Sequence, residues 1–137
     1  MIILSQIKNE EYLDVKSILE KEGIEDELSQ GIIYVLRERD MVMGVGKIAF
    51  EGDYWVLKYI VVKDECRGLN LGDSILKALL FKARSIEVQR VYYSGEEEYL
   101  IKKGFDYNNR DLIDTYKLII DIEDFFDKPC CGDGNEI

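Results

Sequence analysis

The chain has 137 residues, of which 47% are hydrophobic and 34% charged, a composition typical of one globular domain with a buried core. Its formal net charge of −10 argues against general nucleic-acid binding, which requires a basic surface, and favours cationic partners such as amines or basic peptides. The chain contains no histidine, which excludes Ser–His–Asp and Cys–His catalysis and zinc sites with histidine ligands.

No apolar run approaches the roughly 20 residues needed to span a membrane, and the N-terminal residues lack the basic region of a signal peptide. We therefore expect a cytoplasmic protein without a membrane partner. The cysteines are Cys66 and the adjacent pair Cys130 and Cys131. An odd count with an adjacent pair argues against a disulfide framework and favours free thiols, with metal binding or redox chemistry in the tail as the alternative.

The first segments read as a strand, a helix and an acidic connection. Residues 2–7 are apolar enough for a strand, and Asn9 is a plausible N-cap for a helix. Apolar residues recur at helical spacing as far as Leu19, and Gly23 is a typical stop. The acidic residues 24–30 predict a solvated loop or short helix; the functional alternative is a rim over an amine-binding cleft.

Three strands are expected next, joined by tight connections. Residues 31–36, 41–50 and 54–62 are rich in β-branched and aromatic residues, and they are separated by turns at 37–40 and 51–53. Residues 54–62 are almost continuously apolar, which predicts a central strand buried on both faces.

Residues 57–80 carry the clearest signal for a ligand site. An apolar strand runs into a turn at 67–72 that contains Gly68 and Gly72, and a helix is expected from about Asp73. Free N–H groups at a helix start suit an anion, and glycines let the backbone approach it closely. Residues 63–84 contain five basic and three acidic residues, so this segment is locally basic. The pattern predicts a phosphate-binding turn, although a solvated mixture of charges would look similar.

The sequence after the turn predicts a helix that ends within residues 85–88, followed by a short strand and a short helix. A final strand and an acidic tail complete the chain. A strand at Val91–Tyr93 would be parallel to its predecessor, because a helix connects them. The last elements are expected at Glu96–Lys103, closed by Gly104; at Thr115–Ile122, with a short strand at Asp111–Ile113 before it; and in a tail that frays. We predict one α+β domain over residues 1–122 and an acidic tail over 123–137.

This order of elements, with the turn RGLNLG and the later KKGF, resembles the GNAT superfamily of acyl-CoA-dependent N-acyltransferases. The resemblance covers essentially residues 2–122. It implies a mixed, mostly antiparallel sheet of six to seven strands flanked by helices, with strands four and five parallel and splayed apart.

The resemblance also implies a coenzyme A site and no metal. Arg67 and Gly72 match the family turn Q/R-x-x-G-x-G/A, and Asn70 takes the place of its middle glycine. Asparagine tolerates a positive φ, so the turn can keep its shape. We expect Ser74 to face the phosphates and Asp73 to point outward. The full set of expected cofactor-binding residues is Ile60, Val61, Val62, Arg67, Gly68, Leu69, Asn70, Leu71, Gly72 and Ser74.

Catalytic residues cannot be assigned from these motifs. The family's acidic tyrosine falls at Leu100, and Tyr99 is one residue off, which turns it by about 100° on a helix. Weak candidates are Tyr99 as the acid and Glu51 or Asp53 as the base, although packing or turn roles suit each of them. Cys66, expected to be exposed beside the turn, has no partner base for covalent catalysis.

The resemblance implies an N-acetyltransferase that moves an acetyl group from acetyl-CoA to a primary amine by direct transfer in a ternary complex. The acceptor would be a small amine or basic peptide, and a homodimer is compatible with the sequence. One alternative is a catalytically weak acyl-CoA-binding or regulatory module on the same fold. A third, weaker interpretation is an interaction domain that is indifferent to coenzyme A.

Overall fold

The structure is a computed structural model that describes residues 1–109 and 115–127. Within these ranges the chain forms seven strands, four α-helices and two short 3-10 helices. In chain order they are β1 (Ile2–Gln6), η1 (Asn9–Glu11), α1 (Tyr12–Lys21), β2 (Ile32–Glu38), β3 (Met41–Glu51), β4 (Tyr54–Val62), η2 (Asp64–Cys66), α2 (Leu71–Ser85), β5 (Arg90–Tyr93), α3 (Glu98–Lys102), β6 (Asp106–Tyr107), β7 (Leu118–Asp121) and α4 (Ile122–Asp127). None of the helices in the described ranges is long and apolar enough to cross a membrane.

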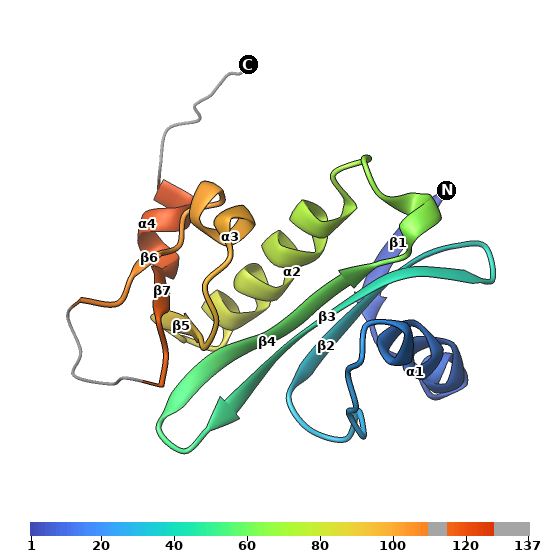
Figure 1. Cartoon of the computed structure of the whole chain (residues 1–137), viewed down its shortest axis with the longest axis horizontal. Coiled ribbons are helices and arrows are strands. Elements are labelled where there is room, and N and C mark those ends of the chain that lie inside the picture. Colours follow the sequence, from blue (N-terminus) through green and yellow to red (C-terminus); the bar gives the residue numbers. More distant parts are fainter. Residues whose placement is uncertain (110–114, 128–137) are drawn as a thin grey trace.

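The strands form one mixed sheet in the order β1-β2-β3-β4-β5-β7-β6, shown in Figure 1. Neighbouring strands pair antiparallel except β4 and β5, which are parallel. The predicted mixed sheet, with its parallel fourth and fifth strands, is therefore confirmed. β4 lies in the middle of the sheet, has the bounds predicted for it, and contributes buried side chains to both faces.

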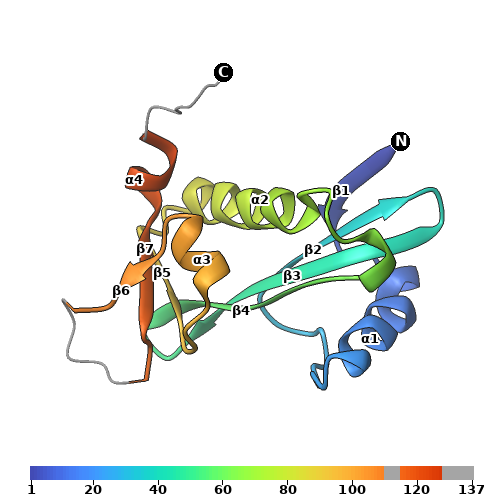
Figure 2. The ribbon, with the colours of Figure 1, turned by 45° about the horizontal axis from the view of Figure 1, so that its top comes forward.

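The two faces of the sheet are covered by different helices, as Figure 2 shows, with α2 on one side and α1 on the other. Val15 and Leu19 of α1 are buried against Val45 of β3 and Val61 of β4. The apolar spacing that predicted α1 is therefore the spacing that packs it on the sheet.

Two glycines of β3 let α2 lie close to the sheet. A Cβ at Gly44 would be 3.0 Å from Ile75 Cδ1, and one at Gly46 would collide with the side chain of Ile75 and come within 3.0 Å of Leu79 Cδ1. Ile75 and Leu79 are fully buried in the larger core on this face. The glycines therefore receive helix side chains, which fixes α2, and the turn before it, over β3 and β4.

β4 and β5 are joined through a single register pair, Val56 with Tyr92, and then diverge. The register of β4 with β3 shifts by one residue here and skips Lys58, which marks a β-bulge. A bulge bends and twists its strand, so β4 turns away from β5 as it continues to Val62. Beyond this pair, the edge of β4 that faces the gap has no strand partner among residues 1–109 and 115–127.

Several elements differ from the sequence expectations. Asn9, expected to cap the first helix, is instead the first residue of η1, and α1 begins at Tyr12. The helix expected at Glu96–Lys103 is the shorter α3, Glu98–Lys102.

α2 begins at Leu71 rather than at about Asp73, because the Ser74 N–H already bonds the Asn70 carbonyl at 3.3 Å. The final strand is only Leu118–Asp121, shorter than predicted. The two-residue β6 was not predicted at all, since two residues carry no periodicity.

The predicted C-terminal tail begins as a packed helix, α4. Ile122 is fully buried, and the Phe126 ring lies 6.2 Å from that of Phe81 and 5.0 Å from the Arg84 guanidinium carbon. The Asp124 N–H donates to Asp121 Oδ1 at 3.3 Å, at the start of the helix. Apolar residues within the acidic segment therefore extend the domain beyond residue 122. The strand expected at 111–113, and Cys130 and Cys131, lie outside the described residues.

Candidate functional site

A cavity of about 700 Å³ opens between β4, the start of α2 and α3. Eight of the ten residues expected to bind the cofactor line it. They are Ile60, Val61, Val62, Arg67, Gly68, Asn70, Leu71 and Gly72. The structure thus brings the free edge of β4 and the glycine-containing turn into one concave site.

The turn before α2 has the backbone geometry of an anion cradle. Gly68 has φ +92°, and Asn70 has φ 58° and ψ 27°, so Asn70 adopts the left-handed conformation at the position where the family pattern has glycine. The N–H groups of the first helical residues have no partner within the helix, and they lie at the positive end of its dipole. Gly72 adds no side chain to this first turn, and Asp73 and the Tyr99 hydroxyl lie at the same end of the cavity.

Arg67 ties the turn to two neighbouring elements. Its Nε donates to the Val62 carbonyl at 3.0 Å, and its guanidinium pairs with Asp64 at 2.9 Å and with Glu22, just after α1, at 3.6 Å. These ion pairs are largely exposed, and such pairs contribute little to stability. An anion in the cavity can therefore compete for this guanidinium.

The structure corrects the expected direction of Asp73 and places Ser74 outside the cavity lining. Asp73 lines the cavity instead of pointing outward, because its carboxylate is held by Lys77 at 3.1 Å and Lys103 at 3.3 Å. Ser74 is exposed and is not part of the lining; its hydroxyl lies 3.4 Å from the Asn70 carbonyl. The two lysines offset the negative charge that Asp73 brings to the helix start.

Tyr99 lies at the turn end of the cavity. Its hydroxyl is 3.2 Å from the place that a Cβ on Gly72 would take, and Ile60 Cγ2 is 3.7 Å from the same point. Burial and the nearby Asp73 carboxylate raise the pKa of Tyr99 above its ordinary value. Tyr99 therefore stays protonated and offers a hydrogen-bond donor beside the helix start.

The family's tyrosine position, Leu100, is 3% exposed and packs in the α2-side core. Leu100 also lines the cavity, and where β4 and β5 part the lining includes Tyr93 and Glu97, whose hydroxyl and carboxylate are hydrogen-bonded at 2.8 Å. Burial, then the bond to Glu97 and its charge, raise the pKa of Tyr93 to about 12. Sequence reasoning missed this pair, since only the fold brings the end of β5 and the residue before α3 to the cavity.

The expected bases, Leu69 of the turn, and Cys66 lie outside the cavity lining. Glu51 pairs with Lys58, which does line the cavity, while Asp53 is exposed in the β3–β4 turn and outside it. Leu69 is 63% exposed and does not line the cavity. Cys66, expected to be exposed, is buried, because η2 turns its side chain into the α2-side core.

The acidic residues 24–30 are anchored by a buried lysine. Lys47, 6% exposed, contacts both carboxylate oxygens of Asp26 at 2.9 and 2.8 Å, and the Tyr59 hydroxyl donates to Asp26 at 2.6 Å. Burial would raise the pKa of Asp26, but the bonds from Lys47 and Tyr59 and the lysine charge outweigh it, so the pKa is lowered. This part of the acidic loop is thus fastened to the sheet.

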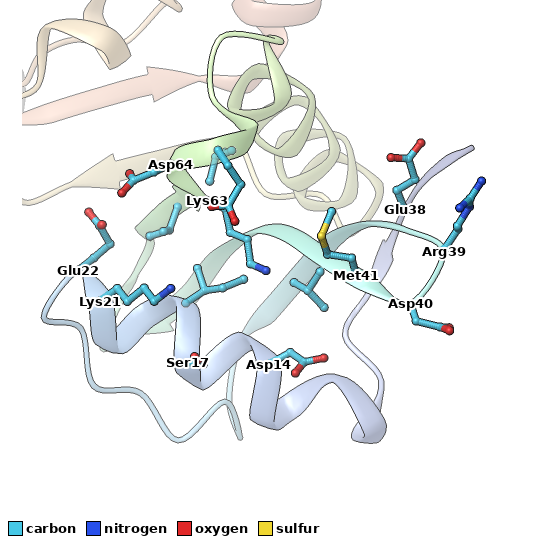
Figure 3. Close-up of a pocket in the computed structure, with 15 residues that line it drawn as sticks. Asp14, Ser17, Lys21, Glu22, Glu38, Arg39, Asp40, Met41, Lys63 and Asp64 are labelled. Atoms are coloured by element: carbon cyan, nitrogen blue, oxygen red, sulfur yellow. The ribbon is translucent and has the colours of Figure 1, made fainter.

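A second cavity, of about 780 Å³, lies at the end of β4 on the α1 side. Figure 3 shows Asp14 and Lys21 of α1 on one side, Arg39 of the β2–β3 turn on another, and Lys63 and Asp64 beyond the end of β4. Its lining mixes both signs of charge and contains neither a glycine nor the start of α2. The cavity at the turn is therefore the better anion site. No cluster in the described residues has three or more ligands suited to a metal ion.

Comparison with known proteins gives one family and one fold. The model of the acetyltransferase (GNAT) family matches residues 3–102. No curated protein matches the sequence.

Similar solved structures share the fold at low sequence identity. N-acetylglutamate synthase from Neisseria gonorrhoeae, complexed with coenzyme A and N-acetyl-glutamate, has a TM-score of 0.75 at 14% identity over 89% of this chain. The chain spans only 35% of that protein's length. The ribosomal-protein-S18-alanine N-acetyltransferase from Escherichia coli has a TM-score of 0.68 at 13% identity, over 89% of this chain and 94% of its own. Rv2747 from Mycobacterium tuberculosis, in complex with CoA and NLQ, has a TM-score of 0.69 at 19% identity, over 81% of this chain and 75% of its own.

Proposed function

Because the chain belongs to the acetyltransferase (GNAT) family, we propose that it transfers an acetyl group from acetyl-CoA to a primary amine, directly and within a ternary complex. The acceptor is a small amine or a basic peptide. Similar structures that contain coenzyme A support the choice of co-substrate.

The observation that carries this proposal is the single cavity that joins the glycine-containing turn to the free edge of β4. The residues present fit coenzyme A, because the turn offers unpaired N–H donors and two positive-φ residues where a pyrophosphate would lie. The extended edge from Ile60 to Val62 leads from that turn toward the gap between β4 and β5. A long, narrow ligand with a phosphate group near one end matches this shape.

The chain's own groups can assist the transfer at the gap. Attack by the neutral amine on the thioester carbonyl forms the C–N bond, and the C–S bond then breaks. In this proposal, backbone N–H groups on the edge of β4 beyond its pairing with β5 polarise the carbonyl oxygen, and fixed donors of this kind stabilise the developing negative charge. The net charge of −10 favours the approach of a cationic acceptor.

One observation favours the catalytically weak alternative, an acyl-CoA-binding module. Leu100, at the position of the family's acid, is buried and can give no proton. The two functions differ in turnover and not in cofactor binding, so they can be separated by experiment.

The test is calorimetric titration with acetyl-CoA, followed by a thiol-release assay over small primary amines and lysine-rich peptides. Binding together with amine-dependent release of thiol supports the transferase. Binding without release from any amine points to the module. No binding of acetyl-CoA overturns both functions.

A further inference from the structure

The cavity contains one tyrosine–carboxylate pair at the point where β4 and β5 part. Tyr93 directly follows Tyr92, the residue of β5 that pairs with β4, so it lies at the start of the gap. Its hydroxyl donates to Glu97 Oε1 at 2.8 Å. A Cβ on Gly95 would come within 3.0 Å of the Tyr93 ring, so the glycine lets the chain fold tightly around that ring.

Glu97 differs from the other carboxylates that line the same cavity. Asp73 is held by two lysines, and Glu22 lies 3.6 Å from the Arg67 guanidinium. Within the part of the chain that the structure describes, Glu97 has no ion pair, and its one hydrogen-bond donor is Tyr93. Among the three carboxylates that line the cavity, Glu97 is therefore the one that no cation holds within the described residues, and its side chain bonds a tyrosine of the same cavity.

We propose that Glu97 and Tyr93 are the proton-transfer pair of the reaction, with Glu97 as the base for the acceptor amine and Tyr93 as the donor to the departing sulfur. This inference rests on the proposed acetyltransferase function. In this proposal the general acid is Tyr93 of β5, beside the gap between β4 and β5. The reaction then needs no tyrosine at position 100, which is a leucine.

The proton balance closes within the pair. When the amine nitrogen bonds to the carbonyl carbon, Glu97 takes the nitrogen's surplus proton, directly or through one water. The electrons of the breaking C–S bond go to sulfur, which takes the hydroxyl proton of Tyr93. The tyrosinate then recovers a proton from Glu97 along their 2.8 Å hydrogen bond. The amine proton ends on the thiol, and the pair returns to its starting state.

Tyr99 is the competing donor, and its position argues against that role. Its hydroxyl lies beside Gly72 at the phosphate end of the cavity, whereas Tyr93 lies where β4 and β5 separate. We therefore expect Tyr99→Phe to raise the KM for acetyl-CoA while kcat changes little. Loss of Tyr93 or Glu97 should instead lower kcat and change the KM for acetyl-CoA little.

The variants Glu97→Gln and Tyr93→Phe keep side-chain size and remove one proton-transfer group each. Assayed with an amine that the wild-type protein acetylates, each should lower kcat by about 100-fold, the usual scale for acid–base groups. The calorimetric Kd for coenzyme A should stay within about threefold of the wild-type value, since neither substitution removes a group proposed to bind the cofactor. The double variant should be no more than about threefold slower than the worse single one, because groups that act as a unit are not additive.

A matched control exists on the surface. Tyr107 donates to Glu96 Oε2 at 2.9 Å, a bond of the same chemistry, and neither residue lines the cavity. Tyr107→Phe and Glu96→Gln should leave kcat within about twofold of wild type, since surface changes away from a site are usually small.

Failure of the inference and failure of the proposed function give different results. A wild-type protein that releases thiol with no amine contradicts the function, and the pair's role with it. An active wild type whose Glu97→Gln and Tyr93→Phe variants keep full kcat contradicts the pair alone. Equal losses in the surface controls would also overturn it. If one cavity variant does not fold, as judged by its Kd for coenzyme A, the other decides.

Discussion

Two tyrosine–carboxylate hydrogen bonds lie on opposite faces of the sheet and have different surroundings. Tyr59 donates to Asp26 under the acidic loop, and Tyr93 donates to Glu97 in the cavity. Lys47 contacts both oxygens of Asp26, whereas Glu97 has no ion pair among the described residues. The comparison shows that the lysine, and not the tyrosine, distinguishes the carboxylate that fastens a loop to the sheet from the one that no cation holds among the described residues.

The pKa values of Asp26 and of the two tyrosines reflect these surroundings. Lys47 helps to lower the pKa of Asp26, so that carboxylate stays ionised at neutral pH. Burial comes first among the causes that raise the pKa of Tyr59, and Asp26 adds to it. Tyr93, with a pKa of about 12, is also protonated at neutral pH. Both tyrosines are therefore hydrogen-bond donors to their carboxylates, and the two pairs differ in the lysine that holds Asp26.

The largest effect on stability should come from removing the cation of the anchored pair. Lys47→Met leaves Asp26 ionised under the loop without its partner, and breaking a buried ion pair in this way costs about 3 kcal/mol. Urea unfolding measures the change. The double variant Lys47→Met/Asp26→Leu should recover most of the loss, because it leaves no unpaired charge. A single variant as stable as wild type would contradict the anchoring role.

The next effect tests the cavity. Gly72→Glu adds a Cβ that would lie 3.2 Å from the Tyr99 hydroxyl, and a negative charge beyond it, at the end of the cavity where the pyrophosphate is proposed to lie. We expect the KM for acetyl-CoA to rise at least about tenfold, or about 1.4 kcal/mol. Gly72→Gln adds a side chain of equal size without the charge, so the difference in KM between the two variants measures the effect of the charge. An unchanged KM in both variants would show that the ligand binds elsewhere.

The fold could largely be predicted from the sequence because its signals are local. The apolar run of β4, the glycines of the turn and the spacing within α2 each specify their own element. The α4 helix was not predicted, because the high acidic content of residues 123–137 indicated a solvated tail. Phe125 and Phe126, which lie within this segment, pack against the core. The two-residue β6 exists only through its pairing with β7.

The site was predictable where backbone forms it and not where side chains do. Asn70 has the left-handed conformation that its place in the pattern required. By contrast, the direction of the Asp73 carboxylate depends on Lys103, which is distant in sequence, and the pairing of Lys47 with Asp26 crosses from strand to loop. A lone lysine within the apolar β3 was the signal available for that pair.

A smaller effect is the pH dependence of stability that the ion pair between Lys47 and Asp26 produces. The folded pKa of Asp26 is below its unfolded value of about 3.8, so its contribution to stability is complete above that pH and is lost as pH falls through the folded pKa. Below pH 4 the free energy of unfolding should therefore fall more steeply for wild type than for Lys47→Met/Asp26→Leu. Parallel curves would mean that Asp26 ionisation is not coupled to folding.

The smallest effect is expected at Asn70, where the cavity depends on backbone shape alone. Asn70→Gly keeps the positive φ at no steric cost but gives the unfolded chain more freedom, so stability should change by less than about 0.5 kcal/mol. The Kd for coenzyme A should be equal or lower. Asn70→Ala, strained at φ 58°, should cost about 1 kcal/mol and weaken binding. If Asn70→Gly raises the Kd for coenzyme A as much as Asn70→Ala does, the asparagine side chain itself contacts the ligand. The turn would then bind its anion through a side chain as well as through backbone amide groups.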